Sequence, residues 1–367
     1  MKRIKMIVIM CIWFIFRITA GFGEDSIPGI WSHNAYDSIT YAPEGYYSIV
    51  DSFMYYYDPD TFSPLLLCSR LNCLHWQEEN LAECDAFVSG FIYSKYFDQH
   101  LYYEDIDENG LCICLMNPDG TAHEKWISAI MPEAKQWIPY GFQDKYYFFI
   151  PMEMEPGDEL MINTRCRLCA LDLSRPSDKP IIVEEWTGFT GNSLMLLEVL
   201  DGKLYYMSGT YEGDKKLWLF DLEKRQKSEL LSFQVPAYHY VADSVIYVLQ
   251  PNTGVFRIRA GSAEKETLIL KDEDDMRGTE YYWDNRYIYG VTSYEDQLLC
   301  DVDIWDLEGN HIIREKIPGE KITMITEEHL FFKTEFDDKP GLVVGLDSLL
   351  QGNPIVYDFI YPERINP

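Results

Sequence analysis

The sequence lacks the compact motifs of the common enzyme classes. It contains no Gly-x-Ser-x-Gly turn, no phosphate-binding loop, no Gly-x-Gly-x-x-Gly motif and no His-Glu-x-x-His motif. His123-Glu124 has no second histidine at the spacing that a metalloprotease helix requires. Pairs of carboxylates from distant strands remain as a catalytic device, because such pairs leave no local signature. We therefore predict no catalytic residue, and a non-enzymatic function is favoured.

Basic residues are few in comparison with acidic ones. The chain has 31 Lys and Arg against 60 Asp and Glu, which gives a formal net charge of −29. A surface of this sign repels phosphate backbones and anionic lipid heads. Nucleic acids are therefore excluded as partners, while cations, basic proteins and neutral polymers such as glycans remain open.

No apolar stretch is long enough to cross a membrane. The longest, Met6–Phe16, is shorter than the roughly 20 residues that a bilayer requires. Basic residues precede it and small residues follow it, as in a secretory signal peptide. We expect residues 1–23 to be a cleaved signal and residues 24–45 to lead into the first repeat. The mature protein would then be secreted or associated with the cell envelope, without a transmembrane span. A short buried helix is the alternative.

A turn residue, usually Asp, followed by a short tyrosine-rich run recurs along the chain. Asp98-Gln-His-Leu-Tyr-Tyr and Asp201-Gly-Lys-Leu-Tyr-Tyr are two copies. The residues just before the apolar runs lie 41 to 58 positions apart: Phe53, His100, Lys145, Lys203, Ser244, Arg286 and His329. A period of about 40–50 residues is typical of propeller blades with four strands. The first run can also be the later strand of a unit that starts with Tyr46–Val50, so six or seven blades are expected, with seven preferred.

The second half of each unit ends in residues that favour tight turns. Asn117-Pro-Asp-Gly and Glu308-Gly-Asn are examples, and Gly and Asn accept the positive φ that hairpins need. Strands rich in Tyr, Ile, Val and Phe, without long helical periodicity, indicate an all-β protein. A small antiparallel sheet cannot bury both faces alone, and stacking such sheets around an axis solves this. We expect a single β-propeller domain over residues 46–367. A β-sandwich or a β protein of two domains is the alternative.

Three cysteines and a histidine fall in one segment, as Cys68, Cys73, His75 and Cys84. Thiolates and imidazole suit tetrahedral Zn²⁺, and four protein ligands make a closed structural site. The spacing Cys-x4-Cys-x-His-x8-Cys differs from common zinc fingers. Exported thiols also oxidise readily, so a disulfide among these cysteines is favoured over zinc. Neither alternative leaves an open position for catalysis.

The same region carries a family resemblance. Met54-Tyr-Tyr-Tyr-Asp-Pro-Asp-Thr is followed by Pro64-Leu-Leu-Leu-Cys-Ser-Arg-Leu-Asn-Cys-Leu-His and then by Cys84-Asp-Ala. This arrangement resembles exported bacterial β-propeller proteins of unknown function and, more distantly, the periplasmic TolB-type propellers. Members often carry a lipoprotein cysteine, which this sequence lacks. The resemblance implies a propeller outside the cytoplasm and implies no reaction.

A second candidate metal site is Asp105-x-Asp107-x-Asn109-Gly110. Carboxylates at alternate positions with a glycine at the bend match the start of a calcium-binding loop. The twelfth position is Met116 in place of the bidentate Glu, so a polar hairpin tip is favoured over a Ca²⁺ site at Asp105, Asp107 and Asn109.

Three functions follow from these observations. The preferred one is an extracytoplasmic binding module for an unidentified protein or glycan, because a propeller presents a rigid face with variable loops. The second is a carbohydrate-active hydrolase or lyase, which would bring several carboxylates and a Trp or Tyr together in the central channel. The third is a structural protein of the cell envelope. The fold alone does not choose among them.

Overall fold

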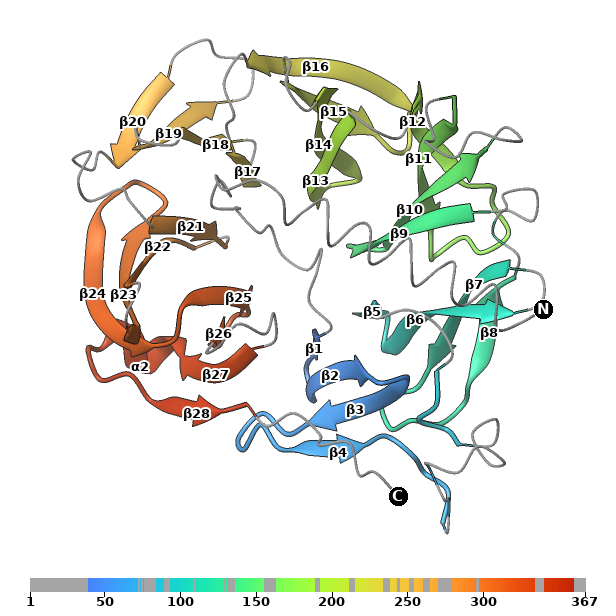
Figure 1. The fold of residues 1–367 in the computed structure, drawn as a ribbon, viewed down its shortest axis with the longest axis horizontal. Helices are drawn as coiled ribbons and strands as arrows, with labels where there is room; N and C mark the ends of the chain where they lie inside the picture. Colours follow the sequence, from blue (N-terminus) through green and yellow to red (C-terminus); the bar gives the residue numbers. More distant parts are fainter. Residues whose placement is uncertain are drawn as a thin grey trace.

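In the described part of the chain, the computed structural model contains seven four-stranded antiparallel sheets arranged as a ring (Figure 1). The described residues are 39–71, 73, 75, 84–88, 93–107, 110–128, 130, 136–154, 163–188, 192–210, 215–233, 238–242, 245–250, 254–259, 265–269, 279–284, 286–294, 297–333 and 340–359. The predicted signal peptide, residues 1–23, lies outside these ranges. The predicted all-β propeller is confirmed, with the preferred number of blades.

The sheets are blades 1 to 7 in chain order. Blade 1 consists of β1 (Ile39–Ala42), β2 (Gly45–Val50), β3 (Phe53–Tyr57) and β4 (Pro64–Leu66). Blade 2 consists of β5 (Ser94–Phe97), β6 (His100–Asp107), β7 (Gly110–Met116) and β8 (Glu124–Ile127). Blade 3 consists of β9 (Gln136–Gln143), β10 (Tyr146–Glu153), β11 (Arg165–Asp172) and β12 (Ile181–Thr187). Blade 4 consists of β13 (Asn192–Leu200), β14 (Lys203–Thr210), β15 (Lys215–Asp221) and β16 (Gln226–Phe233).

The remaining three blades have the same order. Blade 5 consists of β17 (Tyr238–Ala242), β18 (Val245–Gln250), β19 (Gly254–Arg259) and β20 (Lys265–Ile269). Blade 6 consists of β21 (Thr279–Trp283), β22 (Tyr287–Tyr294), β23 (Gln297–Asp306) and β24 (His311–Pro318). Blade 7 consists of β25 (Lys321–Ile325), β26 (His329–Lys333), β27 (Pro340–Gly345) and β28 (Val356–Asp358), with the short helix α2 (Leu346–Leu350) between its last two strands.

Each blade is a simple meander, and its first strand lies nearest the centre of the ring (Figure 1). The repeated aspartate forms the tight turn of a hairpin. Asp98 and Gln99 have φ of 46° and 65°, and Asp201 and Gly202 have φ of 49° and 70°. Two consecutive positive φ angles characterise the type I′ turn, which matches the twist of the strands it joins. The periodicity in the sequence is therefore a periodicity of turns.

The first copy of the repeat belongs to a different hairpin from the other six. Asp51 and Ser52 also have positive φ, but they join β2 to β3, whereas Asp98 joins the first two strands of its blade. The Phe53 run is thus the later strand of a unit whose earlier strand is β2. The innermost strand, β1, falls within residues 24–45, which we expected to lead into the propeller.

In the described part of the chain, each blade contains four consecutive strands, so no strand from one end of the chain completes a blade at the other end. The ring is therefore closed by side chains that pack between blades 7 and 1. Tyr46 and Phe62 of blade 1 pack with Phe331 of blade 7, and all three are fully buried. The Tyr46 hydroxyl lies 2.8 Å from Nδ1 of His329. Aromatic burial of this kind stabilises the ring closure by several kcal/mol, at about 25 cal/mol per Å² of apolar surface.

Among the described residues, no helix is long and apolar enough to cross a membrane.

Candidate functional site

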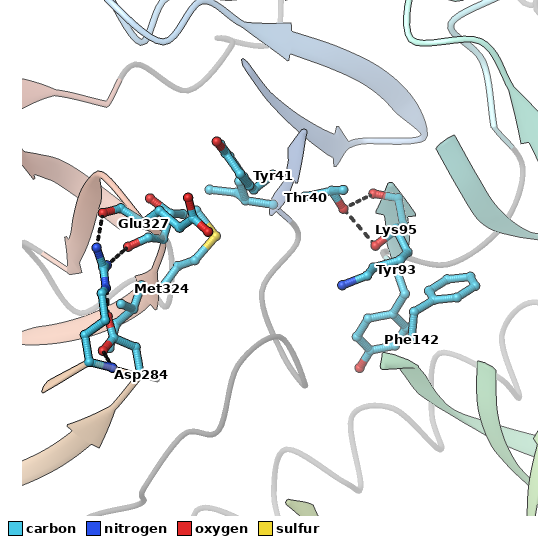
Figure 2. Close-up of a pocket in the computed structure, with 13 residues that line it drawn as sticks. Thr40, Tyr41, Tyr93, Lys95, Phe142, Asp284, Met324 and Glu327 are labelled. Atoms are coloured by element: carbon cyan, nitrogen blue, oxygen red, sulfur yellow. Dashed lines mark hydrogen bonds and ion pairs between the residues drawn. The ribbon is translucent and has the colours of Figure 1, made fainter. Parts of the chain in front are cut away.

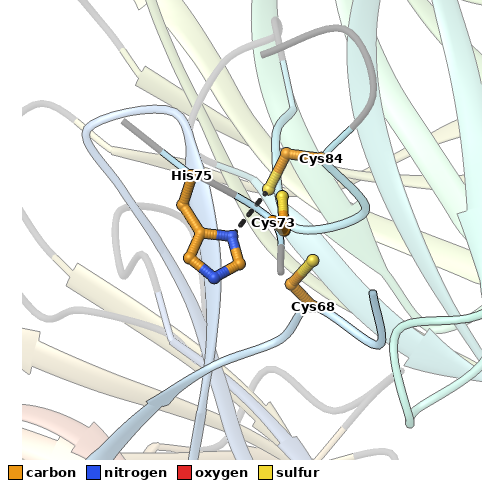
Figure 3. A group of neighbouring side chains, drawn as sticks. All are labelled: Cys68, Cys73, His75 and Cys84. Atoms are coloured by element: carbon orange, nitrogen blue, oxygen red, sulfur yellow. Dashed lines mark hydrogen bonds between the residues drawn. The ribbon is translucent and has the colours of Figure 1, made fainter. Parts of the chain in front are cut away.

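The structure brings the four predicted zinc or disulfide residues together at the edge of blade 1 (Figure 3). Cys68 and the following residues leave β4, while Cys84 begins a segment that returns to β3. Phe87 forms a β-bridge with Phe53, and the N–H of Met54 donates to the carbonyl of Ala86 at 2.8 Å. The two halves of the ligand set are therefore held against the same strand.

The four side chains point toward a common centre. One ligand atom from each of Cys68, Cys73, His75 and Cys84 lies within 4.8 Å of all the others. Nδ1 of His75 is 3.4 Å from Sγ of Cys84. The three thiols are free. Four soft ligands at this separation match the donor set of a tetrahedral Zn²⁺ site, with Zn–S bonds of about 2.3 Å.

Asp85 joins the two halves of this cluster from outside. Its carboxylate accepts hydrogen bonds from Ser69 Oγ at 2.7 Å and from Arg70 Nε at 2.8 Å. Ser69 and Arg70 follow Cys68 directly, and Asp85 follows Cys84. The Asp85 carboxylate holds none of the four described ligand side chains directly, but it ties the segment that follows Cys68 to the segment that begins at Cys84, and groups outside the ligand set often position metal ligands.

The thiols differ in their ease of ionisation. Burial raises the pKa of Cys84 to about 12. Burial alone would also raise the pKa of Cys68. However, the N–H groups of Arg70 and Asp85 and the neighbouring thiols donate to its sulfur, and the pKa of Cys68 is lowered overall. Backbone N–H groups aimed at a sulfur stabilise a thiolate, which is the form that binds metal.

The calcium candidate is placed in part. Asp105 and Asp107 lie near the end of β6, and β7 begins at Gly110. Asn109 and the side chain of Asp107 lie outside the described residues. One carboxylate oxygen of Asp105 accepts a hydrogen bond from the N–H of Ile106 at 2.8 Å. The Ca²⁺ site stays a prediction.

A cavity of about 550 Å³ lies at the centre of the ring (Figure 2). Its walls come from the innermost strands of blades 1, 2, 3 and 7 and from the turns that follow β21 and β25. The lining residues are Ile39, Thr40, Tyr41, Tyr93, Ser94, Lys95, Phe142, Asp284, Arg286, Met324, Ile325, Thr326 and Glu327. Three aromatic rings, several hydroxyls and charges of both signs therefore share one space, with a volume typical of small-molecule sites.

One wall is built around Asp284, which is 5% exposed. Its carboxylate accepts hydrogen bonds from Tyr289 Oη at 2.8 Å and from the N–H groups of Arg286 and Tyr287 at 2.7 Å. It also accepts from Arg286 Nη2 at 3.1 Å. The same guanidinium donates to the carbonyls of Thr326 and Glu327 in blade 7. Asp284 thus joins two blades, and both of its oxygens are engaged.

The opposite wall carries Lys95, whose side chain points into the cavity (Figure 2). The structure gives it no ion pair with any described residue. Burial lowers its pKa, and the carboxylates of Asp144 and Glu198 partly offset this. Burial raises the pKa of Glu198 in β13 to about 7, opposed by Lys95. The cavity therefore offers an ammonium group that a ligand can engage.

Sequence reasoning missed the cavity residues. They lie on the innermost strands and in the turns next to them, between residues 39 and 327, and no local spacing in the sequence joins them. The one available signal was the repeat itself, since the run before each turn is the innermost strand in blades 2 to 7. Sequence reasoning assigned Asp105 to a calcium loop and did not connect it with Cys112, although the strand register pairs the two residues.

Comparisons with known proteins support the fold. No family model matches the sequence, and no curated protein matches it. A prolyl endopeptidase is similar over 89% of this chain and 50% of its own, with a TM-score of 0.58 and 13% identity. An acylaminoacyl peptidase from Pyrococcus horikoshii is similar over 87% of this chain and 48% of its own, with a TM-score of 0.50 and 9% identity. TolB from Acinetobacter baumannii matches 92% of this chain and 84% of its own, with a TM-score of 0.39 and 11% identity. This chain spans about half the length of these peptidases, and at such identities the similarity shows the propeller fold alone.

Proposed function

We propose that the protein is an exported, non-catalytic β-propeller that binds a saccharide in its central cavity. The observation that carries this proposal is the Lys95 ammonium, which projects into a cavity lined by Tyr41, Tyr93 and Phe142. Aromatic rings pack against the apolar faces of sugar rings, and charged groups form the stronger hydrogen bonds to sugar hydroxyls or carboxylates.

The walls of the cavity favour binding over catalysis. Asp284 is held by four hydrogen bonds, so it is poorly placed to exchange a proton with a ligand. Its network instead keeps the wall rigid, which reduces the ordering that a ligand must impose. The acidic surface of the whole chain does not oppose a neutral ligand, because a sugar without charge is not repelled.

We also propose that Cys68, Cys73, His75 and Cys84 bind a zinc ion, the alternative to a disulfide at this site, and that this ion has a structural role. It would hold the connection between blades 1 and 2 against β3, at the edge of the ring and away from the innermost strands. A closed site with four protein ligands offers no position to a substrate. Removal of this zinc is expected to lower stability and to leave the cavity chemistry unchanged.

The test is isothermal titration of the mature protein with neutral and uronic-acid-containing oligosaccharides. K95M is compared with the matched variant K216M, whose lysine is ion-paired with Glu229 on the exposed face of blade 4. A hydrogen bond from a charged group is worth about 1.5–3 kcal/mol, so K95M should weaken binding at least tenfold. K216M should bind like the wild type. No binding to any oligosaccharide, or equal affinities for wild type and K95M, would contradict the proposal.

A carbohydrate hydrolase is the second candidate, and Glu198 is the observation that favours it. A carboxyl whose pKa is about 7 can act as a general acid. Glu198 does not line the cavity, but it lies close enough to Lys95, which does, for their charges to interact. Release of reducing sugar by the wild type, with loss in E198Q, would establish this alternative. Binding without release would support the non-catalytic module.

A further inference from the structure

A second group of metal-ligating side chains lies on the face of blade 2 that packs against blade 1. In the register of β6 and β7, Asp105 lies opposite Cys112 and Tyr103 lies opposite Cys114. Residues two apart on a strand project to the same side. Asp105, Cys112 and Cys114 therefore form one compact group, beside Tyr103.

The ligand atoms of this group are close together and shielded from water. One carboxylate oxygen of Asp105 and the two sulfur atoms lie within 4.8 Å of one another. Cys112 is 0% exposed and Cys114 is 6% exposed. Sγ of Cys112 lies 3.4 Å from the backbone oxygen of Asp105, and Sγ of Cys114 lies 3.9 Å from its Oδ2. Both thiols donate S–H···O hydrogen bonds to Asp105, so the three groups already converge on one another.

The surroundings fit a cation bound by sulfur. Cys112 and Cys114 belong to one buried apolar cluster together with Leu67 and Val88, and such surroundings exclude water and favour soft ligands. With both thiols ionised, the three ligands carry three negative charges. Lys125, which lies opposite Cys114 in β8, supplies one positive charge, so a divalent cation would balance the group.

The ligand types narrow the choice of ion. Two thiolates and one carboxylate suit Zn²⁺ or Cd²⁺, whereas Ca²⁺ and Mg²⁺ take oxygen ligands. We propose that Asp105, Cys112 and Cys114 bind a thiophilic divalent cation between blades 1 and 2, at a site separate from the Cys68, Cys73, His75 and Cys84 cluster. Asp105 then serves this ion in place of calcium.

The test counts metal ions in the mature protein. The chain is purified under reducing conditions, loaded with Zn²⁺ or Cd²⁺, freed of excess metal and analysed for metal and protein. The wild type should retain two equivalents, and C112S and C68S should each retain one. C300S is the matched control, because Cys300 is a buried thiol in β23 outside both groups, and it should retain two.

A milder variant covers the case in which C112S fails to fold. D105N keeps both thiols and should weaken Cd²⁺ binding to this site at least tenfold, measured through the sulfur-to-cadmium absorption band, with an unchanged circular dichroism spectrum. Retention of both equivalents in folded C112S, or unchanged Cd²⁺ affinity in D105N, would overturn the proposal. So would a wild type that holds no metal, or a single equivalent that folded C112S retains.

Discussion

The substitution D284N tests the contact between blades 6 and 7 at the wall of the cavity. In the wild type, one oxygen of Asp284 accepts from the N–H groups of Arg286 and Tyr287 at 2.7 Å, and the asparagine of D284N keeps this oxygen. The second oxygen accepts from Arg286 Nη2 at 3.1 Å and from Tyr289 Oη at 2.8 Å in the wild type, and in D284N an NH₂ group takes its place. The guanidinium then loses its carboxylate partner while it still donates to Glu327.

The size of the effect follows from that loss. A hydrogen bond between charged groups is worth about 1.5–3 kcal/mol; the Asp284 carboxylate is buried, while the Arg286 side chain is 41% exposed and is partly compensated by water. D284N should therefore lower the free energy of unfolding by about 2–3 kcal/mol, measured by urea denaturation.

The matched control is D306N, in the turn between β23 and β24. Asp306 also accepts from two backbone N–H groups, those of Glu308 and Asn310, and its second oxygen accepts only from the neutral amide of Asn310. Its hydrogen bonds are exposed and stay within one turn, so D306N should cost about 0.5–1 kcal/mol. Equal effects of the two substitutions would refute the argument that Asp284 couples two blades.

Three further predictions follow. The folded-state pKa of Glu198, about 7, lies above its ordinary value of 4.5, so this group loses stabilisation as pH rises through about 7. As the pH rises from about 4 to about 8, the unfolding free energy of E198Q should increase by about 2–3 kcal/mol relative to that of wild type. Urea denaturation at each pH measures this, and an unchanged difference between the two proteins would contradict it. Gly120 has φ of 79°, and a Cβ there would lie 2.7 Å from the Leu67 oxygen, whereas at Gly202, with φ of 70°, the nearest atom is 3.9 Å away. G120A should therefore lower the free energy of unfolding by about 1–3 kcal/mol more than G202A does, and equal effects would exclude the clash. D85N should weaken zinc binding at Cys68 roughly 10–100-fold in a chelator competition, and an unchanged affinity would show that Asp85 does not orient the ligands.

The repeat and the Cys/His cluster were predictable because both are local. The turn at Asp201-Gly202 needs two residues with positive φ, and Asp and Gly are residue types that tolerate this conformation, so the turn can be recognised from the sequence. Cys68, Cys73, His75 and Cys84 lie close together in the sequence, so a single connection can bring them into contact.

The cavity and the second thiol group depend on tertiary arrangement. Lys95 and Asp284 line the same cavity only because the seven blades close into a ring. Asp105 reaches Cys112 only through the register of one hairpin, and a shift by one residue would turn these side chains to opposite faces. The same kind of turn joins the first two strands in blade 2 and the second and third strands in blade 1. For this reason, the position of Asp51 did not show that β1 precedes β2.

The most direct test of the central claim is chemical protection of Lys95. The mature protein is acetylated briefly with and without a saturating oligosaccharide found by titration, and each lysine is quantified by mass spectrometry. A ligand in the cavity should reduce acetylation of Lys95 at least fivefold, about 1 kcal/mol of protection, and leave Lys216 unchanged. Equal acetylation of Lys95 in the presence and absence of a bound saccharide would show that the ligand binds elsewhere and would contradict the account.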